Sequence, residues 1–369
     1  MTYHSRLHLL QHTIQESLCD AILIDDKTDL YYLTGLELSA GTLLVHAKGA
    51  ELFVDGRYLE MCQKHSPFPV TLIDPASLPT QLMKPDYAHI RRLAFDSSKT
   101  TYKQHDKFSN ALQAVAKNKS LTLIPLDEPL KLQRTIKDAH EIQALRDAAI
   151  LGSQGFDFVC TLMREGITEQ ECALELEIFW KRHGSKGLAF DPIIAFGPNC
   201  SMPHYRAGHA KLKLGDCILI DIGVIFKHYH SDMTRMAFYG KPDTRLLAVH
   251  AIVQKAQEAA LNLCRPGTSL GALDAAARDL IASHGYGPQF SHSLGHGVGL
   301  DIHEYPTIKN APPFNTAILV PGMVITIEPG IYLPGIGGVR IENTIVITPD
   351  GFEDLTNRST NPVFINCEN

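Results

Sequence analysis

Short apolar runs separated by turn-forming and charged residues follow one another through the first third of the chain. The runs are bounded by turn signals and several end in Asp or Pro, which is typical of β-strands. These strand candidates are residues 21–25, 42–46, 51–55, 70–74, 92–96 and 121–125. A helix is expected ahead of them, over residues 7–18. Alternating helix and strand predict an α/β N-terminal domain with a mixed sheet over residues 1–128.

After a connector at residues 127–130, the pattern changes to helical spacing. Apolar or small side chains recur every three or four residues, which predicts one buried helix face. These side chains belong to Ile142, Leu145, Ala149, Gly152 and Phe156. Thr168, followed three residues later by Glu171, forms a capping box and predicts a second helix over residues 168–183. Two more helices are expected over residues 244–264 and 269–284.

Each pair of predicted helices is followed by a pair of extended segments. The first pair covers residues 216–226 and 229–239, and the second pair covers residues 323–332 and 339–348. This recurrence suits a pseudo-twofold α+β domain, although the two halves share negligible sequence identity. We expect this second domain to occupy residues 129–369.

Composition and charge exclude several classes of protein. The chain has 369 residues, of which 44% are hydrophobic and 20% charged, so it is long enough for two buried cores. Its 34 Lys and Arg residues against 40 Asp and Glu give a net charge of −6, with no long block of one sign. We therefore expect no nucleic-acid partner. No apolar stretch approaches the ~20 residues that span a bilayer, so no membrane partner is expected.

Cysteine usage and the first residues of the chain favour a cytoplasmic protein. The eight cysteines form no CxxC pair, and several lie in apolar runs, as Cys217 does, which indicates reduced and buried thiols. The first residues lack a basic segment followed by an apolar one, so no secretory signal is predicted.

Acidic residues at the ends of apolar runs carry the candidate chemistry. Asp221 follows the apolar residues 217–220, and Glu328 follows residues 323–327. An isolated buried charge is costly, so each carboxylate must be paired, hydrogen-bonded, protonated or bound to a metal. Divalent cations would neutralise a group of such carboxylates, with one neutral imidazole completing the set. The five candidate metal ligands are Asp221, Asp232, His296, Glu328 and Glu342.

The alternative for each of these residues alone is a structural role at the end of a strand. The five together favour a metal site, because ligands on dispersed strands converge only where a site exists.

The motifs around these residues are specific. Asp232 begins Asp-x-Thr-Arg, His296 lies between two glycines, Glu328 precedes Pro-Gly, and Glu342 follows Arg-Ile. Together they resemble the pita-bread metallopeptidases, a family that includes prolidase, aminopeptidase P and methionine aminopeptidase. Residues 7–127 also look like the N-terminal domain of prolidase and aminopeptidase P. The resemblance implies a creatinase/prolidase-like N-terminal domain followed by an α+β pita-bread catalytic domain.

The resemblance also implies two divalent metal ions, most readily Mn²⁺, with Co²⁺, Zn²⁺ or Fe²⁺ as substitutes. In that family pattern, Asp232 and Glu342 bridge the two ions. Asp221 binds one ion, and His296 and Glu328 bind the other. A water between the ions has a lowered pKa and attacks the scissile carbonyl as hydroxide. Glu328 corresponds to the residue that takes the proton of this water and passes it to the leaving amine.

Three further histidines and one arginine match the family pattern. His204 and His303 correspond to the pair that flanks the substrate and donates hydrogen bonds to the scissile carbonyl oxygen. His292 corresponds to a supporting histidine beside the ligand His296, and Arg340 to a residue that orients carboxylates. Ordinary surface or core histidines and an ordinary strand arginine would give the same residues without these roles.

The resemblance implies small peptide substrates with proline at the second position. A dipeptidase must bind the free C-terminal carboxylate of its substrate, which calls for a cation. Between His303 and Glu328 the only basic residue is Lys309. We therefore expect an Xaa-Pro aminopeptidase, with an Xaa-Pro dipeptidase (prolidase) as the alternative. In a dipeptidase, Arg206, Lys309, Arg340 or a partner subunit would supply the cation.

The same fold and residues also suit a hydrolase of broader substrate range on the same metals, or a non-catalytic binding protein. The intact ligand set argues against the binding protein. Tyr205 takes the place of the small residue that often follows the histidine of this family, and we expect it to narrow the pocket. The resemblance also implies a homodimer.

Overall fold

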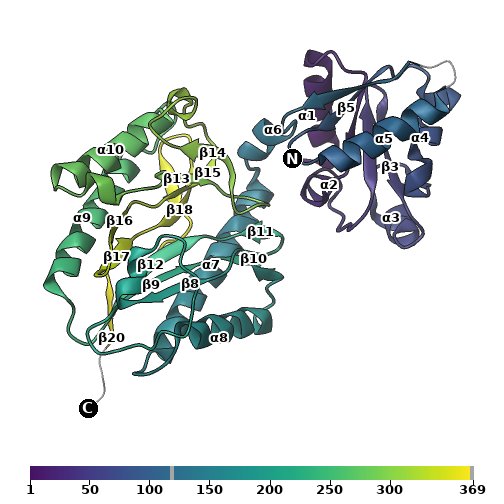
Figure 1. The fold of residues 1–369 in the computed structure, drawn as a ribbon. Helices are drawn as coiled ribbons and strands as arrows, with labels where there is room; N and C mark the ends of the chain where they lie inside the picture. The colour runs from purple at the N-terminus through teal and green to yellow at the C-terminus, as the bar shows by residue number, and fades with distance from the viewer. Residues whose placement is uncertain (117–119, 366–369) are drawn as a thin grey trace. The chain divides into compact units, whose positions relative to one another are not determined.

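The computed structural model of the chain describes residues 1–116 and 120–365, and the fold is drawn in Figure 1. It divides into two compact units, Met1–Arg134 and Thr135–Asn369. Among the described residues, no helix is long and apolar enough to cross a membrane. The seven cysteines in this part of the chain are free, and all but Cys160 are buried. The remaining cysteine, Cys367, lies outside the described residues.

A mixed sheet forms the centre of the first unit, with strand order β4-β3-β2-β1-β5-β6. Its strands are β1 (Ala21–Ile24), β2 (Thr42–His46), β3 (Gly49–Val54), β4 (Val70–Leu72), β5 (Arg92–Asp96) and β6 (Thr122–Leu126). Strand β1 pairs antiparallel with β2 and parallel with β5, as a mixed sheet requires. The predicted mixed sheet and its strands are therefore confirmed.

Helices accompany this sheet along the chain. They are α1 (Tyr3–Glu16), α2 (Lys27–Thr34), α3 (Leu59–His65), α4 (Leu78–Gln81), α5 (Tyr102–Val115) and α6 (Lys131–Thr135). Thr2 caps α1, because its hydroxyl accepts a hydrogen bond from the backbone N–H of Ser5. Leu7, Leu10 and Ile14 are buried at helical spacing on one face of α1. The predicted N-terminal helix is thus confirmed, displaced by a few residues.

The described residues of the second unit include four long α-helices, and each overlaps a predicted one. They are α7 (Ala139–Leu162), α8 (Glu169–Arg182), α9 (Thr244–Leu261) and α10 (Leu270–Ser283). The capping box at the start of α8 is present, with Thr168 as N-cap and Glu171 as its partner. On α7 the predicted stripe is buried except for Ile142, which is half-buried. Gly152 in this stripe is required by packing, because a Cβ there would lie 2.9 Å from Ser231 Oγ.

In the described part of the second unit, the strands form four small sheets, with orders β11-β10-β7, β20-β12-β9-β8, β14-β13-β15-β18-β19 and β16-β17. The strands before α9 are β7 (Gly187–Leu188), β8 (Ile193–Phe196), β9 (Cys217–Ile222), β10 (Val224–Phe226), β11 (Tyr229–His230) and β12 (Met233–Tyr239). The strands after α10 are β13 (Gly295–Gly297), β14 (Glu304–Ile308), β15 (Val324–Ile327), β16 (Gly330–Leu333), β17 (Gly337–Arg340), β18 (Asn343–Ile347), β19 (Phe352–Asp354) and β20 (Val363–Ile365).

Each predicted long strand of this unit is broken into two, and three of the breaks contain an acidic candidate ligand. Asp232 lies between β11 and β12, Glu328 between β15 and β16, and Glu342 between β17 and β18. The fourth break is at Gly223, where a Cβ would lie 2.3 Å from the carbonyl oxygen of Ser231. At Glu328 the following Pro329 has no N–H to continue a ladder. The breaks let the strands change sheets, which turns the acidic side chains inward.

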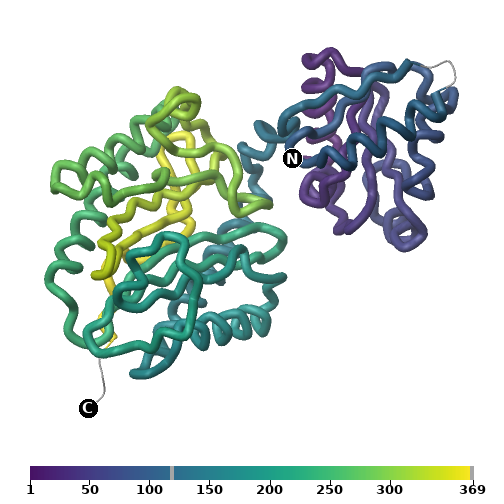
Figure 2. The backbone as a smooth tube through the Cα atoms, in the orientation of Figure 1, coloured from purple at the N-terminus to yellow at the C-terminus, as the bar shows by residue number. Residues whose placement is uncertain are grey.

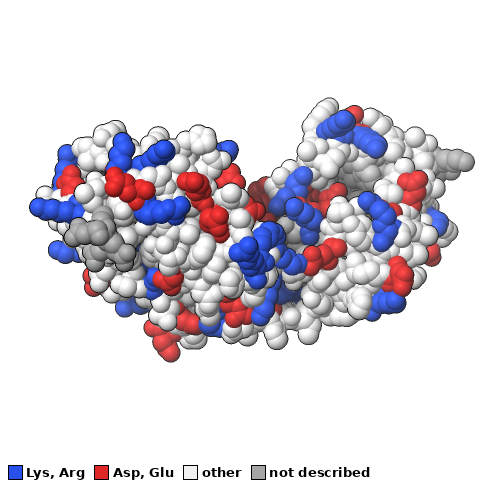
Figure 3. Space-filling model, turned by 90° about the horizontal axis from the view of Figure 1, so that it is seen from below, with Lys and Arg blue, Asp and Glu red and all other residues white. Residues whose placement is uncertain are grey.

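Two apolar clusters flank these sheets. One joins α7 and α8 to strands β8, β9 and β12, and contains the fully buried Trp180. The other joins α9 and α10 to strands β9, β15, β17 and β18. The tube in Figure 2 shows the C-terminal strands, in yellow, beside the teal strands β9 and β12, and these elements are in contact. On the face of this unit drawn in Figure 3, basic and acidic side chains are interspersed.

Candidate metal centre

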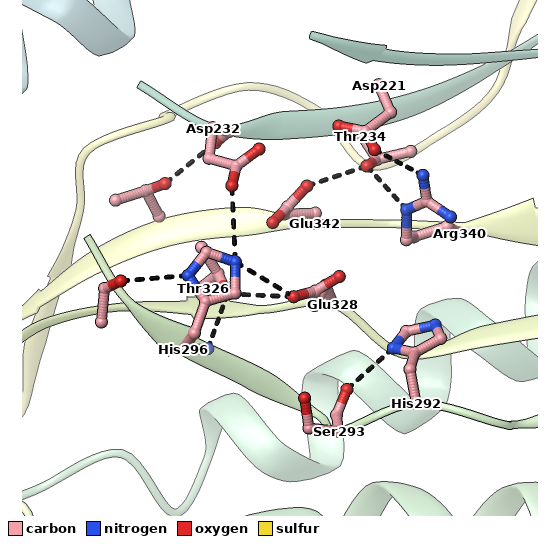
Figure 4. Close-up of polar contacts among 12 residues, drawn as sticks. Asp221, Asp232, Thr234, His292, Ser293, His296, Thr326, Glu328, Arg340 and Glu342 are labelled. Atoms are coloured by element: carbon pink, nitrogen blue, oxygen red, sulfur yellow. Dashed lines mark hydrogen bonds and ion pairs between the residues drawn. The ribbon is translucent and has the colours of Figure 1, made fainter. Parts of the chain in front are cut away.

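Three predicted ligands from distant parts of the chain meet between the sheets of the second unit. Asp232, His296 and Glu342 each offer one ligand atom, and these atoms all lie within 4.8 Å of one another. Figure 4 shows the three side chains pointing toward one another. His296 comes from β13, and the two carboxylates come from the breaks in the broken strands. The pairing of β15 with β13 and with β18 brings β13 close to the strand that follows Glu342.

The hydrogen bonds of His296 define which ring nitrogen faces the carboxylates. Its Nδ1 lies 3.0 Å from the carbonyl oxygen of Gly297, which can only accept, so Nδ1 carries the proton. Burial and, to a smaller extent, the nearby His303 lower the pKa of His296 to about 4, so the ring is neutral near pH 7. Nε2 therefore presents a lone pair to Asp232 Oδ2, 3.5 Å away. A lone pair facing a carboxylate oxygen is the arrangement that a bound cation requires.

Glu328 extends the cluster on the other side of His296. Its Oε1 lies 3.5 Å from His296 Nε2. Thr326 Oγ1 donates a hydrogen bond to the same oxygen at 3.3 Å and accepts one from the backbone N–H of His296 at 3.1 Å. Because Thr326 and Glu328 are two residues apart, their side chains lie on one side of the extended chain. Thr326 thus fixes His296 and Glu328 relative to each other.

The carboxylates of the cluster repel one another, and a bound cation would relieve this repulsion. Burial raises the pKa of Asp232 well above its usual range, and the neighbouring Glu342 and Asp221 carboxylates raise it further. Burial and the same kind of repulsion raise the pKa of Glu328 well above its usual range and that of Glu342 to about 8. Carboxylates so arranged stay protonated or bind a cation. Carboxylate oxygens with one imidazole nitrogen suit hard or borderline divalent ions such as Mn²⁺.

Asp221 has a different partner. Its Oδ2 accepts a hydrogen bond from Arg340 Nη2 at 2.5 Å. Its Oδ1 is buried and has no hydrogen-bond partner among the described residues. A buried oxygen without a donor is costly unless a cation or water satisfies it. Asp221 therefore offers one oxygen to a cation while Arg340 holds the other.

Arg340 is buried and connects several parts of the site. Besides Asp221, it donates to Thr234 Oγ1 at 3.1 Å and to the Tyr332 hydroxyl at 2.7 Å. Thr234 Oγ1 in turn donates to Glu342 Oε2 at 2.8 Å. The arginine thus orients one candidate ligand directly and another through a threonine.

His292 is held by this arginine chain and has no hydrogen bond to His296 in the described part of the chain. Its Nδ1 donates to the carbonyl oxygen of Ser293 at 2.8 Å, so Nε2 accepts from the Tyr332 hydroxyl at 2.9 Å. Burial and, to a smaller extent, the Arg340 charge lower the pKa of His292 to about 4. His292, predicted to support His296, is connected through Tyr332 to Arg340.

His303 and His204 are exposed at the edge of the cluster. The His303 ring stacks edge-on against His296, with ring centroids 4.3 Å apart. Partial burial lowers the pKa of His303, and the neighbouring His204 lowers it further. The backbone next to His303 is anchored by a buried ion pair, in which Lys137 Nζ lies 3.0 Å from Glu304 Oε2. Both histidines therefore lie where a bound molecule could reach them.

Several supporting residues were not singled out from the sequence. They are Thr234, Arg235, Thr326 and Tyr332. Buried Arg235 donates to the carbonyl oxygen of Glu342 at 2.5 Å and to those of Ser359 and Arg358. Thr234 and Arg235 belong to the Asp-x-Thr-Arg motif, which could have indicated them. Tyr332 carries no such signal, because its contacts depend on the pairing of β16 with β17.

Comparisons with known proteins agree with this geometry. The profile of metallopeptidase family M24 matches residues 143–349, and that of the Creatinase/Prolidase N-terminal domain matches residues 6–136. A Pyrococcus horikoshii protein named Xaa-Pro dipeptidase is 36% identical over 91% of this chain and 92% of its own length.

Two solved structures extend the comparison. The Xaa-Pro dipeptidase from Bacillus anthracis superposes with a TM-score of 0.92 at 31% identity, covering 98% of this chain and 100% of its own. The X-Pro aminopeptidase from Thermotoga maritima superposes with a TM-score of 0.86 at 30% identity, covering 96% and 100% of the two chains. These matches confirm the predicted fold class, an α/β N-terminal domain followed by a pita-bread catalytic domain. The chain belongs to metallopeptidase family M24.

Proposed function

We propose that this metallopeptidase is an Xaa-Pro dipeptidase that acts on small peptides with proline at the second position. The observation that carries this proposal is the cluster of Asp232, His296 and Glu342, in a chain whose relatives include proteins named Xaa-Pro dipeptidase. The comparisons favour this activity over the aminopeptidase activity that the shortage of basic residues after His303 led us to expect. The small number of basic residues after His303 is a weaker argument, because a cation that binds the C-terminal carboxylate of the substrate can come from elsewhere in the chain.

The proposed cofactor is a pair of divalent ions, with Mn²⁺ the preferred metal. The residues that would hold the ions are Asp221, through its unpartnered Oδ1, and Asp232, His296, Glu328 and Glu342. The donor set supports this proposal. The carboxylates raise the pKa values of their neighbours, and His296 is neutral, so the cluster has no positive charge of its own that balances them. When bound, such ions supply a water of lowered pKa and polarise the scissile carbonyl.

The chain's own residues then handle protons and orientation. Glu328 Oε1 lies 3.5 Å from His296 Nε2, so Glu328 would be placed to take a proton from the attacking water and deliver it to the proline nitrogen as that nitrogen leaves. His204 and His303 would donate hydrogen bonds to the carbonyl oxygen as negative charge develops on it. Arg340 and His292 would act through other residues. Arg340 donates hydrogen bonds to Asp221 and to the Tyr332 hydroxyl, and this hydroxyl donates to His292.

A dipeptide substrate also needs a cation for its C-terminal carboxylate. Arg340 is buried and its guanidinium is committed to Asp221, Thr234 and Tyr332. Lys309 and Arg206 are exposed, so they are better candidates than Arg340 for this cation. A homodimer in the cytoplasm is part of the proposal, and light scattering on the purified chain measures the oligomeric state.

The second candidate is an Xaa-Pro aminopeptidase, which leaves the C-terminal side of the peptide open. It is favoured by the superposition on the X-Pro aminopeptidase from Thermotoga maritima, at a TM-score of 0.86. The difference between the two candidates is substrate length.

An assay of the Mn²⁺-loaded chain on Xaa-Pro dipeptides and matched Xaa-Pro-Yaa tripeptides separates the candidates. The proposal predicts that the dipeptide has the higher kcat/KM, and that Lys309→Ala or Arg206→Ala raises KM for the dipeptide alone. Preferred turnover of tripeptides would establish the aminopeptidase instead. Absence of turnover on both, with metal bound, would refute both candidates and leave a hydrolase of other substrates or a binding protein.

A further inference from the structure

Tyr205, which we expected to narrow the pocket, directs its hydroxyl to the start of α8 and to a short helix after β8. Its hydroxyl donates a hydrogen bond to Glu169 Oε2 at 2.7 Å and accepts one from Asn199 Nδ2 at 2.9 Å. Glu169 is the first residue of α8, and Asn199 lies in the short helix Gly197–Ser201. A tyrosine at this position therefore joins the segment after β8 to the start of a helix.

Glu169 is fully buried, and its carboxylate accepts hydrogen bonds on both oxygens. Oε1 accepts from the backbone N–H of Phe196 at 2.8 Å and from Asn199 Nδ2 at 2.9 Å. Oε2 accepts from the Tyr205 hydroxyl and from the backbone N–H of Gly208 at 3.1 Å. We call Glu169, Asn199 and Tyr205 the Glu169 network. Because a buried carboxylate is costly when its donors are missing, this network fixes residues 199–208 firmly to α8.

His204 lies inside the fixed segment, directly before Tyr205. On its other side, the carbonyl oxygen of Pro203 accepts a hydrogen bond from Arg340 Nη1 at 3.4 Å. The histidine itself is exposed and close enough to His303 and His292 to lower their pKa values. An exposed side chain is therefore carried by a backbone held on both sides, by Arg340 and by the Glu169 network.

We propose that Tyr205 is a positioning residue: through Glu169 it holds the backbone that aims His204 at the substrate. This rests on the proposed function, in which His204 donates to the scissile carbonyl oxygen. A hydrogen bond that strengthens in the transition state needs its donor held in place beforehand, so loosening the segment should lower kcat more than it raises KM. Gly208 and Tyr205 are closely packed, because a Cβ at Gly208 would lie 3.2 Å from the Tyr205 hydroxyl.

The test compares Tyr205→Phe with a matched control. Tyr239→Phe also removes a tyrosine hydroxyl from a hydrogen bond in the same unit, since that hydroxyl accepts from the backbone N–H of Glu165 at 2.9 Å. We expect Tyr205→Phe to lower kcat on an Xaa-Pro dipeptide about tenfold with less than about a twofold change in KM. Tyr239→Phe should change neither. Equal kcat for Tyr205→Phe and the wild type would overturn the proposal.

The dependence on His204 is measured by a double-mutant cycle. If Tyr205 acts through His204, Tyr205→Phe should have no further effect on kcat in the His204→Ala background. A full tenfold loss in that background would show a general structural role and refute the positioning role. Wild-type turnover by His204→Ala would overturn both this inference and the role given to His204, while leaving dipeptidase activity itself intact.

A readout without turnover keeps the inference separate from the proposed function. The Cε1–H signal of His204 can be assigned in a carbon–proton NMR spectrum by its loss in His204→Ala. We expect this signal to shift or broaden in Tyr205→Phe and to stay in place in Tyr239→Phe. An unchanged His204 signal in Tyr205→Phe would count against the inference even if the chain hydrolyses no Xaa-Pro peptide.

Discussion

Glu169 and Glu342 are both buried carboxylates of the second unit, with 0% and 2% of their surfaces exposed, but their surroundings differ. Glu169 accepts hydrogen bonds from Phe196, Asn199, Tyr205 and Gly208, all neutral donors. Glu342 accepts one from Thr234 and otherwise faces Asp232 and His296, whose ligand atoms lie within 4.8 Å. The Glu169 carboxylate has hydrogen-bond donors on both oxygens. The Glu342 carboxylate instead lies beside the Asp232 carboxylate, and the two repel each other when both are charged.

The contrast separates structural acids from functional ones. Burial alone does not indicate a metal site, because a buried carboxylate surrounded by donors is stable on its own. Acids that raise one another's pKa values indicate that something is to be bound there. The two kinds of carboxylate should therefore respond oppositely when the charge is removed.

The largest expected effect is on activity. Glu342→Gln removes a charged oxygen from the centre of the cluster, so we expect kcat/KM on an Xaa-Pro dipeptide to fall by at least about a thousandfold with Mn²⁺ present. Asp232→Asn should behave alike. Circular dichroism should show an unchanged fold in both. Turnover near the wild-type level in either metal-loaded variant would contradict the metal-binding role.

The next effect concerns stability and tests the contrast directly. Glu169→Gln places an amide N–H₂ against donors, leaves polar groups unpaired, and should lower the free energy of unfolding by about 2–3 kcal/mol. Glu342→Gln in metal-free protein should leave stability unchanged or raise it, because it removes repulsion from Asp232. Urea unfolding in the presence of a chelator measures both. Equal destabilisation by the two substitutions would erase the distinction.

The sequence predicts the strands and helices well where local signals are strong. The capping box at Thr168 and the apolar runs of the first unit appear as expected. The breaks at Asp232, Glu328 and Glu342 were not predicted, because they depend on strands changing sheets, which apolar runs do not encode. The inward turn of the acidic residues is a consequence of those breaks.

The candidate ligands could be found from motifs, but their hydrogen-bond partners could not. Tyr332 reaches Arg340 and His292 only through sheet pairing, and Tyr205 turns to Glu169, 36 residues earlier in the chain. Contacts over such separations depend on how helices and sheets pack. Local sequence therefore identifies the chemistry and leaves open how each side chain is aimed.

The smallest expected effect concerns a buried base without a full set of partners. His250 is buried, and its Nε2 has no hydrogen-bond partner among the described residues. Burial and, to a smaller extent, the Arg235 charge lower the pKa of His250 to about 4. The unfolded chain binds a proton at this residue below about 6.5, and the folded chain does not until about 4. Stability should therefore fall as the pH drops through this window, with a contribution from His250 of at most about 1.4 kcal/mol per pH unit.

His250→Gln removes this titration. Urea unfolding at several pH values between about 4 and 6.5 should give a shallower decline in the variant than in the wild type. Parallel declines would mean that folding does not lower the pKa of His250.

Calorimetric titration of Mn²⁺ into chelator-treated wild type and Glu342→Gln tests the central claim most directly. We predict that the wild type binds a pair of Mn²⁺ ions per chain. Because the cluster carboxylates have raised pKa values, binding should release protons, detected as a dependence of the heat on the buffer. Glu342→Gln should lose most of this binding. A wild-type chain that takes up no Mn²⁺, or a variant that binds it equally well, would contradict the account.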